Sequence, residues 1–292
     1  MRYFEHLHPL CILLYFIATI GLTLTCFHPV MLLLSILGAF SFLLRLKGAR
    51  GAARHLRFVL PLFLLVAVGN PLINHRGVTL LGMLFDQWIT LEAICYGVTA
   101  GLSLAALILW FACYSEVMTS DKFLYLFGKA APSSALLVTM ALQLVPKLDR
   151  QLSQIRQCQE MLRPEKKTLG GKLGTAVRHT STLVGWSMEN AVEQADSMKA
   201  RGYGLRRRTT FHLFHFETRD ACFLAGLLAL AGACVIARSF GHGYMEFYPR
   251  MDAVITGDSG IVLYVLFALL AFLPAILEGR EAWRWRSYGL IR

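Results

Sequence analysis

The stretch Ser197-Met198-Lys199-Ala200-Arg201-Gly202-Tyr203-Gly204 ends a long polar-faced segment in a chain that is otherwise strongly apolar. In it an arginine stands between alanine and glycine, two small residues that leave room for another molecule to approach. Polar residues with helical periodicity precede it, and apolar blocks lie on either side of the polar segment. The stretch therefore predicts a membrane protein with a helical insert that ends at an arginine.

The composition fits this class. The chain has 292 residues, of which 56% are hydrophobic and 16% are charged, and its mean hydropathy is +0.53, which is too apolar for a soluble globular protein. The net charge of +11 comes from Lys and Arg residues that avoid the apolar runs. Trp283 and Trp285 interleave with Arg284 and Arg286, as is typical of a belt at the membrane interface. No longer series of Trp or Tyr alternates with basic residues as a strand-binding groove requires, so we expect no nucleic-acid binding.

Six apolar stretches are candidate membrane spans. Several are shorter than the ~20 residues usual for crossing a hydrocarbon core of about 30 Å, which predicts short helices with little tilt. His28-Pro29 separates the first two and predicts a tight helical hairpin, because proline ends one helix and suits the first turn of the next. The predicted spans are Leu10–Phe27, Val30–Leu44, Phe58–Ile73, Leu91–Tyr114, Ala221–Ala237 and Gly260–Leu277.

The charges of the connections predict the orientation. The link Arg45–Arg57 carries five basic residues and no acidic one, and the segment Ser115–Arg219 carries sixteen basic and nine acidic residues. By contrast, Asn70–Glu92 and Ser239–Ser259 together hold two basic and five acidic residues. Because basic connections face the cytoplasm, both termini and the central segment are expected to be cytoplasmic.

No group of residues predicts a metal site, a cofactor site or an enzyme. The seven cysteines form no Cys-x-x-Cys pair and suit small core residues. His212 and His215 have helical spacing but no third ligand nearby. The run Gly170-Gly171-Lys172-Leu173-Gly174-Thr175 lacks the residue order that holds phosphates, so any ATP is expected to bind another subunit.

Two long amphipathic helices are predicted in the central segment. The first starts near Ala141, with Pro146 near its start, and the second starts after a break at Gly170-Gly171. Both are too polar to insert into a membrane. Their apolar faces include Val145, Leu148 and Leu152 in the first, and Val184, Met188 and Ala191 in the second.

Each predicted helix ends at an arginine followed by a helix-breaking residue. Arg163 precedes Pro164, and Arg201 precedes Gly202. An arginine at a helix C-terminus is favoured by the helix dipole and can extend a planar guanidinium into a groove of another protein. Ordinary C-terminal caps have the same composition. Two such endings in one polar insert favour docking.

These features resemble the transmembrane T component of energy-coupling factor (ECF) transporters, a family that includes cobalt-transport permeases. The resemblance covers nearly the whole chain. It is carried by Asn70-Pro71-Leu72 followed by Gly77, by Pro146 before Gln157-Cys158-Gln159-Glu160-Met161-Leu162-Arg163, and by Ser197–Gly204 with Arg208-Thr209 behind it. The first arginine departs from the family's usual Ala-Arg-Gly and reads Leu162-Arg163-Pro164.

The resemblance implies a non-catalytic scaffold in a prokaryotic cell (inner) membrane. Its partners would be two ABC-type ATPase subunits and a small membrane S component that binds a vitamin or metal ion. Arg163 and Arg201 would contact the ATPases, with Ala200 and Gly202 leaving room for close approach. The apolar faces of the two helices would contact the S component or each other.

The predicted fold class is accordingly an all-α polytopic membrane protein with about six spans. Residues 1–114 would form the N-terminal membrane helices, 115–219 a cytoplasmic coupling domain of two amphipathic helices, and 220–292 the C-terminal membrane helices and a basic tail. The alternative function is a self-sufficient permease or secondary carrier that binds solute within its own spans. A third class, a membrane enzyme acting on lipids, is disfavoured because the Arg45–Arg57 link is purely basic.

Overall fold

The chain is described by a computed structural model that covers residues 4–74, 77–84, 87–128, 131–162, 169–205, 214–240, 245, 247 and 257–287. It divides into two compact units. The first, here called the apolar unit, comprises Met1–Phe123 and Phe214–Arg292. The second, here called the polar unit, is Leu124–Leu213. Each unit is described by itself below.

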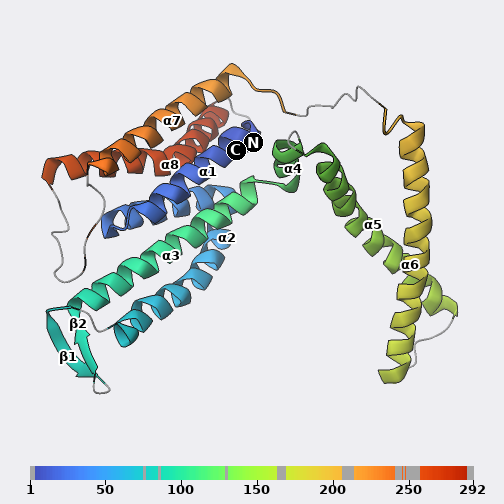
Figure 1. Ribbon diagram of the computed structural model, residues 1–292, viewed down its shortest axis with the longest axis horizontal. Helices are drawn as coiled ribbons and strands as arrows, with labels where there is room; N and C mark the ends of the chain where they lie inside the picture. The colour runs from blue at the N-terminus through green and yellow to red at the C-terminus, as the bar shows by residue number, and fades with distance from the viewer. Residues whose placement is uncertain are drawn as a thin grey trace. The chain divides into compact units, whose positions relative to one another are not determined.

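Helices dominate the apolar unit (Figure 1). They are a 3₁₀ turn at Phe4–His6 and the helices α1 (Pro9–Thr25), α2 (Pro29–Ile73), α3 (Leu91–Val117), α7 (Thr218–Ser239) and α8 (Gly257–Ser287); α4 (Ser120–Gly128) follows α3. The break predicted at His28-Pro29 is present, and both α1 and α2 begin with a proline. His8 and His28 cap these helices by accepting hydrogen bonds from the amides of Leu10 and Val30.

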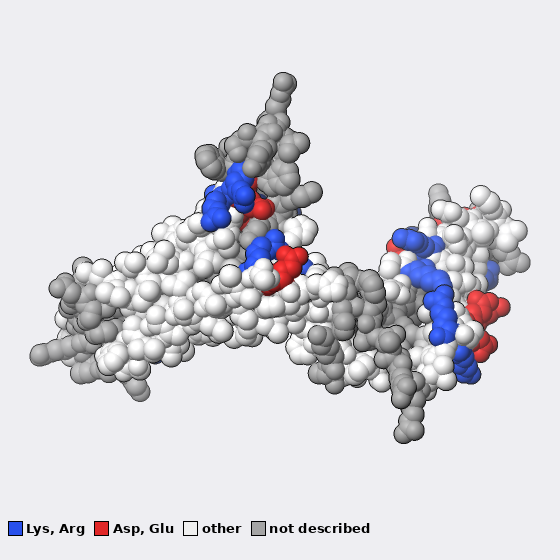
Figure 2. Space-filling model, turned by 90° about the horizontal axis from the view of Figure 1, so that it is seen from above, with Lys and Arg blue, Asp and Glu red and all other residues white. Residues whose placement is uncertain are grey.

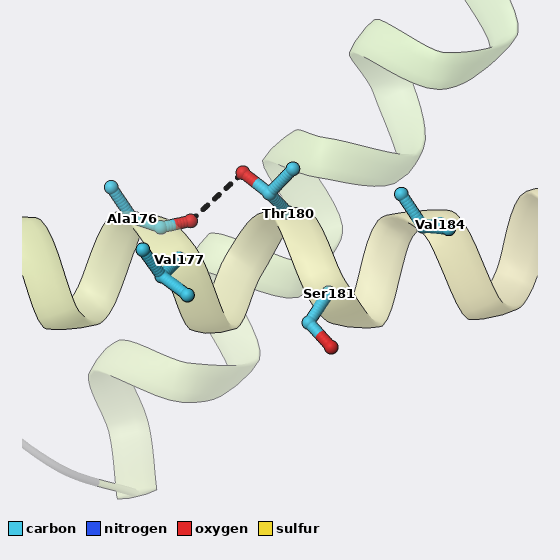
Figure 3. Close-up of a pocket in the computed structure, with 5 residues that line it drawn as sticks. All are labelled: Ala176, Val177, Thr180, Ser181 and Val184. Atoms are coloured by element: carbon cyan, nitrogen blue, oxygen red, sulfur yellow. Dashed lines mark hydrogen bonds between the residues drawn. The ribbon is translucent and has the colours of Figure 1, made fainter.

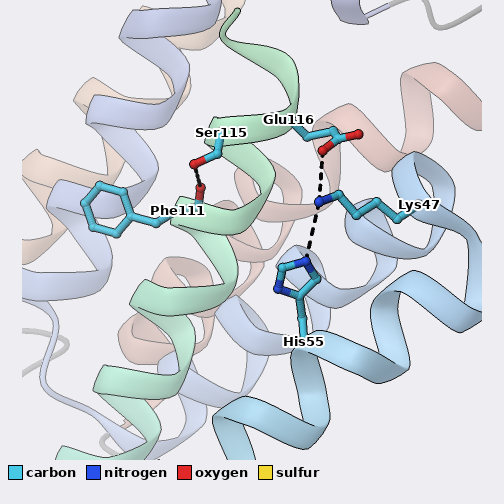
Figure 4. A network of polar contacts seen from close by, with 5 residues as sticks. All are labelled: Lys47, His55, Phe111, Ser115 and Glu116. Atoms are coloured by element: carbon cyan, nitrogen blue, oxygen red, sulfur yellow. Dashed lines mark hydrogen bonds and ion pairs between the residues drawn. The ribbon is translucent and has the colours of Figure 1, made fainter. Parts of the chain in front are cut away.

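The α2 helix contains a turn that divides it into two arms. Gly48 has φ +70° and ψ 177°, outside the helical region. The sequence predicted a connection over Arg45–Arg57; instead the helices extend into it from both sides, leaving only this glycine non-helical. Lys47 on the first arm lies 2.9 Å from the Glu116 carboxylate of α3 and 3.5 Å from Nε2 of His55 on the second arm (Figure 4). These polar contacts link the turn to the end of α3.

The two arms of α2 run in opposite directions along α3. On the first arm, the Trp110 indole donates to Ser35 Oγ at 2.8 Å, and the Cys113 thiol lies 3.5 Å from the Ala39 carbonyl. On the first arm, residues later in the chain therefore contact residues later in α3. On the second arm the reverse holds, because Phe63 lies against Gly101 and Ala67 lies against Gly97. The α3 helix is therefore packed between two antiparallel arms.

A short hairpin that the sequence did not predict lies between α2 and α3. Strands β1 (Leu80–Leu84) and β2 (Gln87–Thr90) are antiparallel, with a register irregularity between Leu80 and Gly82. Glu92, which follows β2, is buried. Its carboxylate accepts from the Thr79 amide at 3.1 Å and from the Thr79 hydroxyl at 2.7 Å, and so fixes the start of the hairpin.

Four helices are long and apolar enough to cross a membrane: α2, α3, α7 and the Gly260–Glu281 part of α8. The α1 helix is a shorter apolar helix of 17 residues. In Figure 2 most of the visible surface of the apolar unit carries no charged side chain, and charged side chains gather toward one end. The prediction of a predominantly helical membrane protein is confirmed at this level, with the hairpin as an addition.

The polar unit contains α5 (Pro132–Leu162) and α6 (Leu169–Ala200). The first residue predicted for each of these two helices is wrong. The first helix begins nine residues before Ala141, since the apolar stretch preceding Pro146 belongs to the same helix. The second has no break at Gly170-Gly171, because both glycines lie in the first turn of α6, where interior hydrogen bonds are not yet required.

Gly38 tests the packing of the apolar unit. A Cβ at Gly38 would lie 2.8 Å from the Ala271 Cβ and 3.0 Å from its carbonyl oxygen, so α2 and α8 could not keep their separation. We expect Gly38→Ala to lower the free energy of unfolding by about 1–3 kcal/mol, which outweighs the roughly 1 kcal/mol that alanine adds to helix propensity. The midpoint of unfolding in detergent measures the change.

Gly21 in α1 provides the control, because no atom lies within 4 Å of its added Cβ. Gly21→Ala should leave the midpoint unchanged or raise it. Equal stability of the Gly38→Ala and wild-type proteins would contradict this account of the α2–α8 contact.

Candidate docking site at the end of α6

Arg201 occupies the C-cap of α6 in a well-formed helix-ending turn. The Tyr203 amide donates to the Met198 carbonyl at 3.0 Å, and the Gly202 amide donates to the Lys199 carbonyl at 2.9 Å. This pair of bonds is a Schellman motif, which requires a residue in the left-handed region just after the cap. Gly202 supplies it with φ +84°. Gly202 thus fixes the end of α6. The Arg201 side chain at this end is exposed.

The side of this turn is hollowed. A shallow depression of about 190 Å³ is lined by Leu136 near the start of α5 and by Met198, Arg201, Gly202 and Tyr203. Tyr203 is 46% exposed. The arginine therefore stands beside an apolar and aromatic surface. A guanidinium with five donors and an adjacent apolar hollow is the kind of anchor that protein interfaces favour.

The helices α5 and α6 pair in opposite directions within the polar unit. The Lys147 ammonium of α5 donates a hydrogen bond to the Asn190 side chain of α6 and lies 5.4 Å from the centre of the Trp186 ring. Leu136, earlier in α5, borders the turn after α6. The α5 residues Leu148 and Leu152 are half-buried, and Ile155 is buried.

The predicted apolar face of α6 points away from α5. Five half-buried α6 residues recur at helical spacing and include the α5 contacts Trp186 and Asn190; these five are Thr175, His179, Leu183, Trp186 and Asn190. At 100° per residue, the predicted apolar residues lie on the opposite side. Val177 is 63% and Met188 is 68% exposed, and Val184 and Ala191 are exposed too. We call Val177, Val184, Met188, Ala191 and Ala195 the α6 apolar stripe.

Part of this stripe borders a broad, shallow depression of about 460 Å³, lined by Ala176, Val177, Thr180, Ser181 and Val184. Figure 3 shows these side chains along successive turns of α6. The Thr180 hydroxyl donates to the Ala176 carbonyl at 2.9 Å, so its polar atom is satisfied within the helix. The surface offered to a partner is therefore mainly apolar.

The site residues predicted from the sequence have different positions in the structure. Ala200, Arg201 and Gly202 form one turn. Leu148 and Leu152 lie on the half-buried side of α5, whereas Val145 is 66% exposed. Arg163 lies outside the described residues; α5 is described up to Leu162.

Several contributors to the site were not predicted. Leu136 and Tyr203 complete the hollow beside Arg201. The contacts of Lys147 with Trp186 and Asn190 were not predicted either. No local pattern identifies these pairs, because their members are about 40 to 65 residues apart. Only Tyr203, directly after the glycine of a C-cap, had a sequence signal.

No metal-binding group is present in the part of the chain that the structure describes, since no three His, Cys, Asp or Glu side chains gather there. Comparison with protein-family models and with curated protein sequences finds no match for this chain. The function must therefore be inferred from the chemistry of the site.

A substitution at Gly202 tests the geometry of the helix-ending turn around Arg201. Gly202→Ala should destabilise the turn by about 1–2 kcal/mol, because an L-residue pays this cost in the left-handed region and the new Cβ would lie 3.0 Å from Leu205 Cδ1. We expect faster hydrogen exchange at the Tyr203 amide, whose bond to Met198 closes the turn.

The matched control is Gly185→Ala in the interior of α6, where nothing lies within 4 Å of the added Cβ. This change should stabilise the helix by roughly 1 kcal/mol and leave Tyr203 exchange unchanged or slower. Unaltered exchange at Tyr203 in Gly202→Ala would count against a structural role for the glycine.

Proposed function

We propose that the chain is the transmembrane T component of an ECF-type importer. In this role it couples ATP hydrolysis by two partner ABC ATPases to uptake of a vitamin or metal ion bound by a separate S component. The observation that carries the proposal is an exposed arginine at the glycine-terminated end of α6, a long helix whose apolar stripe faces away from α5.

The Arg201 turn is the proposed ATPase contact. The turn fixes the backbone position from which the Arg201 side chain extends, and the neighbouring hollow of Leu136 and Tyr203 can receive an apolar side chain of the partner. Two backbone hydrogen bonds close the end of the helix, so a partner bound to this turn would move α6 with it. Arg163 is proposed as the second contact on the strength of the sequence resemblance.

The α6 apolar stripe is the proposed S-component contact. Its residues are exposed, yet charged residues such as Arg178, Glu189 and Glu193 occur within the same turns. A helix with this charge density is disfavoured inside a bilayer, so a protein surface is the more suitable cover. Movement of α6 by the ATPases would then act directly on the substrate-binding subunit.

Six membrane spans are proposed for the apolar unit: α1, the two arms of α2, α3, α7 and α8. The count is supported by the opposite directions of the two α2 arms along α3. An even number of spans agrees with cytoplasmic placement of both termini, as the charge distribution predicts. The location proposed is the prokaryotic inner membrane.

Arg201→Ala tests ATPase docking. Removal of a buried interface anchor costs about 2 kcal/mol or more, so we expect a loss of at least about tenfold in ATPase activity that co-purifies with the tagged chain from native membranes. Membrane insertion should be normal. The control is Arg178→Ala, which removes an exposed arginine from the middle of α6. Full ATPase retention by the Arg201→Ala protein would refute the docking role.

Met188→Asp tests the α6 apolar stripe separately. A carboxylate at this 68% exposed position should release the small membrane protein from the purified complex while the ATPases remain, because a charge in an apolar interface is costly to desolvate. Thr182→Asp, on the opposite side of α6, is the control. If import needs no second membrane protein, Met188→Asp should leave the composition of the purified complex and its uptake unchanged. This result would favour the self-sufficient permease.

A further inference from the structure

We infer that Arg50, Arg54 and Arg57, at the start of the second α2 arm, form a binding surface for the headgroups of anionic phospholipids. This inference concerns only the apolar unit and does not depend on the proposed function. It rests on the charge, exposure and helical spacing of one face of α2.

The three arginines are separated by four and three residues, and all are exposed. Positions with this spacing lie on one face of a helix. The other Lys and Arg residues of the Arg45–Arg57 region lie against other helices. Lys47 pairs with Glu116, and the Arg45 guanidinium lies against α8, 3.0 Å from where a Cβ at Gly279 would stand.

No ion pair is formed by Arg50, Arg54 or Arg57 within the described part of the chain. The first turns of this arm also carry no acidic side chain. Three arginines near a helix N-terminus are electrostatically unfavourable without a counter-charge, because the helix dipole is positive there. An anionic partner would remove this repulsion.

The same helix face continues as an exposed apolar surface. Beyond Arg57, the positions on this face are all uncharged and exposed, with Leu65 at 69% and Val68 at 60%; they are Pro61, Leu64, Leu65, Val68 and Leu72. The opposite face, with Ala52, Val59 and Ala67, is buried. The exposed face thus has a basic end and an apolar body.

The apolar body fits acyl chains in length. From Arg57 to Leu72 the helix rises about 22 Å at 1.5 Å per residue, which is most of a hydrocarbon core of about 30 Å. The arginines then lie where the headgroups begin, and guanidinium groups bind phosphate oxygens in a two-pronged geometry. A lipid with a net negative charge matches both parts of this face.

The test uses the full chain in a neutral detergent with added phosphatidylglycerol or phosphatidylcholine of identical acyl chains. Phosphatidylglycerol should raise the unfolding temperature more than phosphatidylcholine does. Each basic residue near an anionic surface changes lipid affinity by about fivefold, so the triple variant Arg50→Gln, Arg54→Gln, Arg57→Gln should need about a hundredfold more phosphatidylglycerol for the same shift.

Two further variants test whether the lipid response depends on positive charge at this face of α2 or on the total charge of the protein. Replacement of the three arginines by lysine should keep most of the lipid response. Loss of three exposed arginines from the polar unit, in Arg150→Gln, Arg156→Gln, Arg178→Gln, should leave the response unchanged. If the polar-unit variant loses the response and the α2 variant keeps it, the assignment is wrong.

Further measurements on the wild-type protein keep the inference testable if a variant fails to fold. The phosphatidylglycerol response should weaken as sodium chloride increases from about 0.05 to about 0.5 M, because salt screens exposed charges. Inorganic phosphate and glycerol phosphate should produce no comparable stabilisation. An equal effect of free phosphate would mean an anion site, and an equal effect of phosphatidylcholine would mean no charge recognition; either result would overturn the inference.

Discussion

Close backbone approach at three glycines is the constraint on which the apolar unit depends. Gly38 meets Ala271 of α8, and Gly97 and Gly101 meet the Ala67 and Phe63 carbonyl regions of α2. Helices in a membrane gain little from burying apolar groups against one another, since lipid is equally apolar. They associate through close packing and a few hydrogen bonds, such as that from Trp110 to Ser35.

The two arms of α2 follow from this constraint. With α3 between them, each arm needs small residues on the side that faces α3, and Gly48 allows the chain to reverse without a long loop. The basic residues near the turn are sorted by the same geometry. Lys47 is drawn to Glu116 of α3, whereas Arg50, Arg54 and Arg57 lie on the opposite side of the helix from the packed face.

The sequence predicted element types well and spatial relationships poorly. Apolar blocks, the His28-Pro29 break and the end of α6 at Gly202 are local properties, and each is present. The reversal at Gly48 was overestimated in length because charges alone do not interrupt a helix that is packed on one side. The β-hairpin was missed because its stability depends on Glu92, which follows the hairpin and accepts hydrogen bonds from Thr79 ahead of it.

In the candidate docking site, too, the sequence predicts local features but not contacts between distant residues. Periodicity groups the residues of the α6 apolar stripe on one face, but it does not state what covers that face. Contacts between α5 and α6 use the other side, through Lys147, Trp186 and Asn190. Pairs so far apart in the chain have no local signal, so the outward direction of the stripe could be learned only from the structure.

Comparison of the two exposed apolar faces indicates why they need different partners. The α2 face has no charge from Leu64 to Leu72, and its arginines are confined to one end. The α6 apolar stripe is equally exposed, but Arg178, Glu189 and Glu193 occur in the same turns of the helix. Lipid can surround the first because every charge reaches the headgroups, whereas a membrane-spanning α6 would bury its charges in hydrocarbon. A protein with its own polar groups can satisfy both parts of α6, and this is the physical reason why the proposed function assigns the polar unit to subunit binding and not to a membrane span.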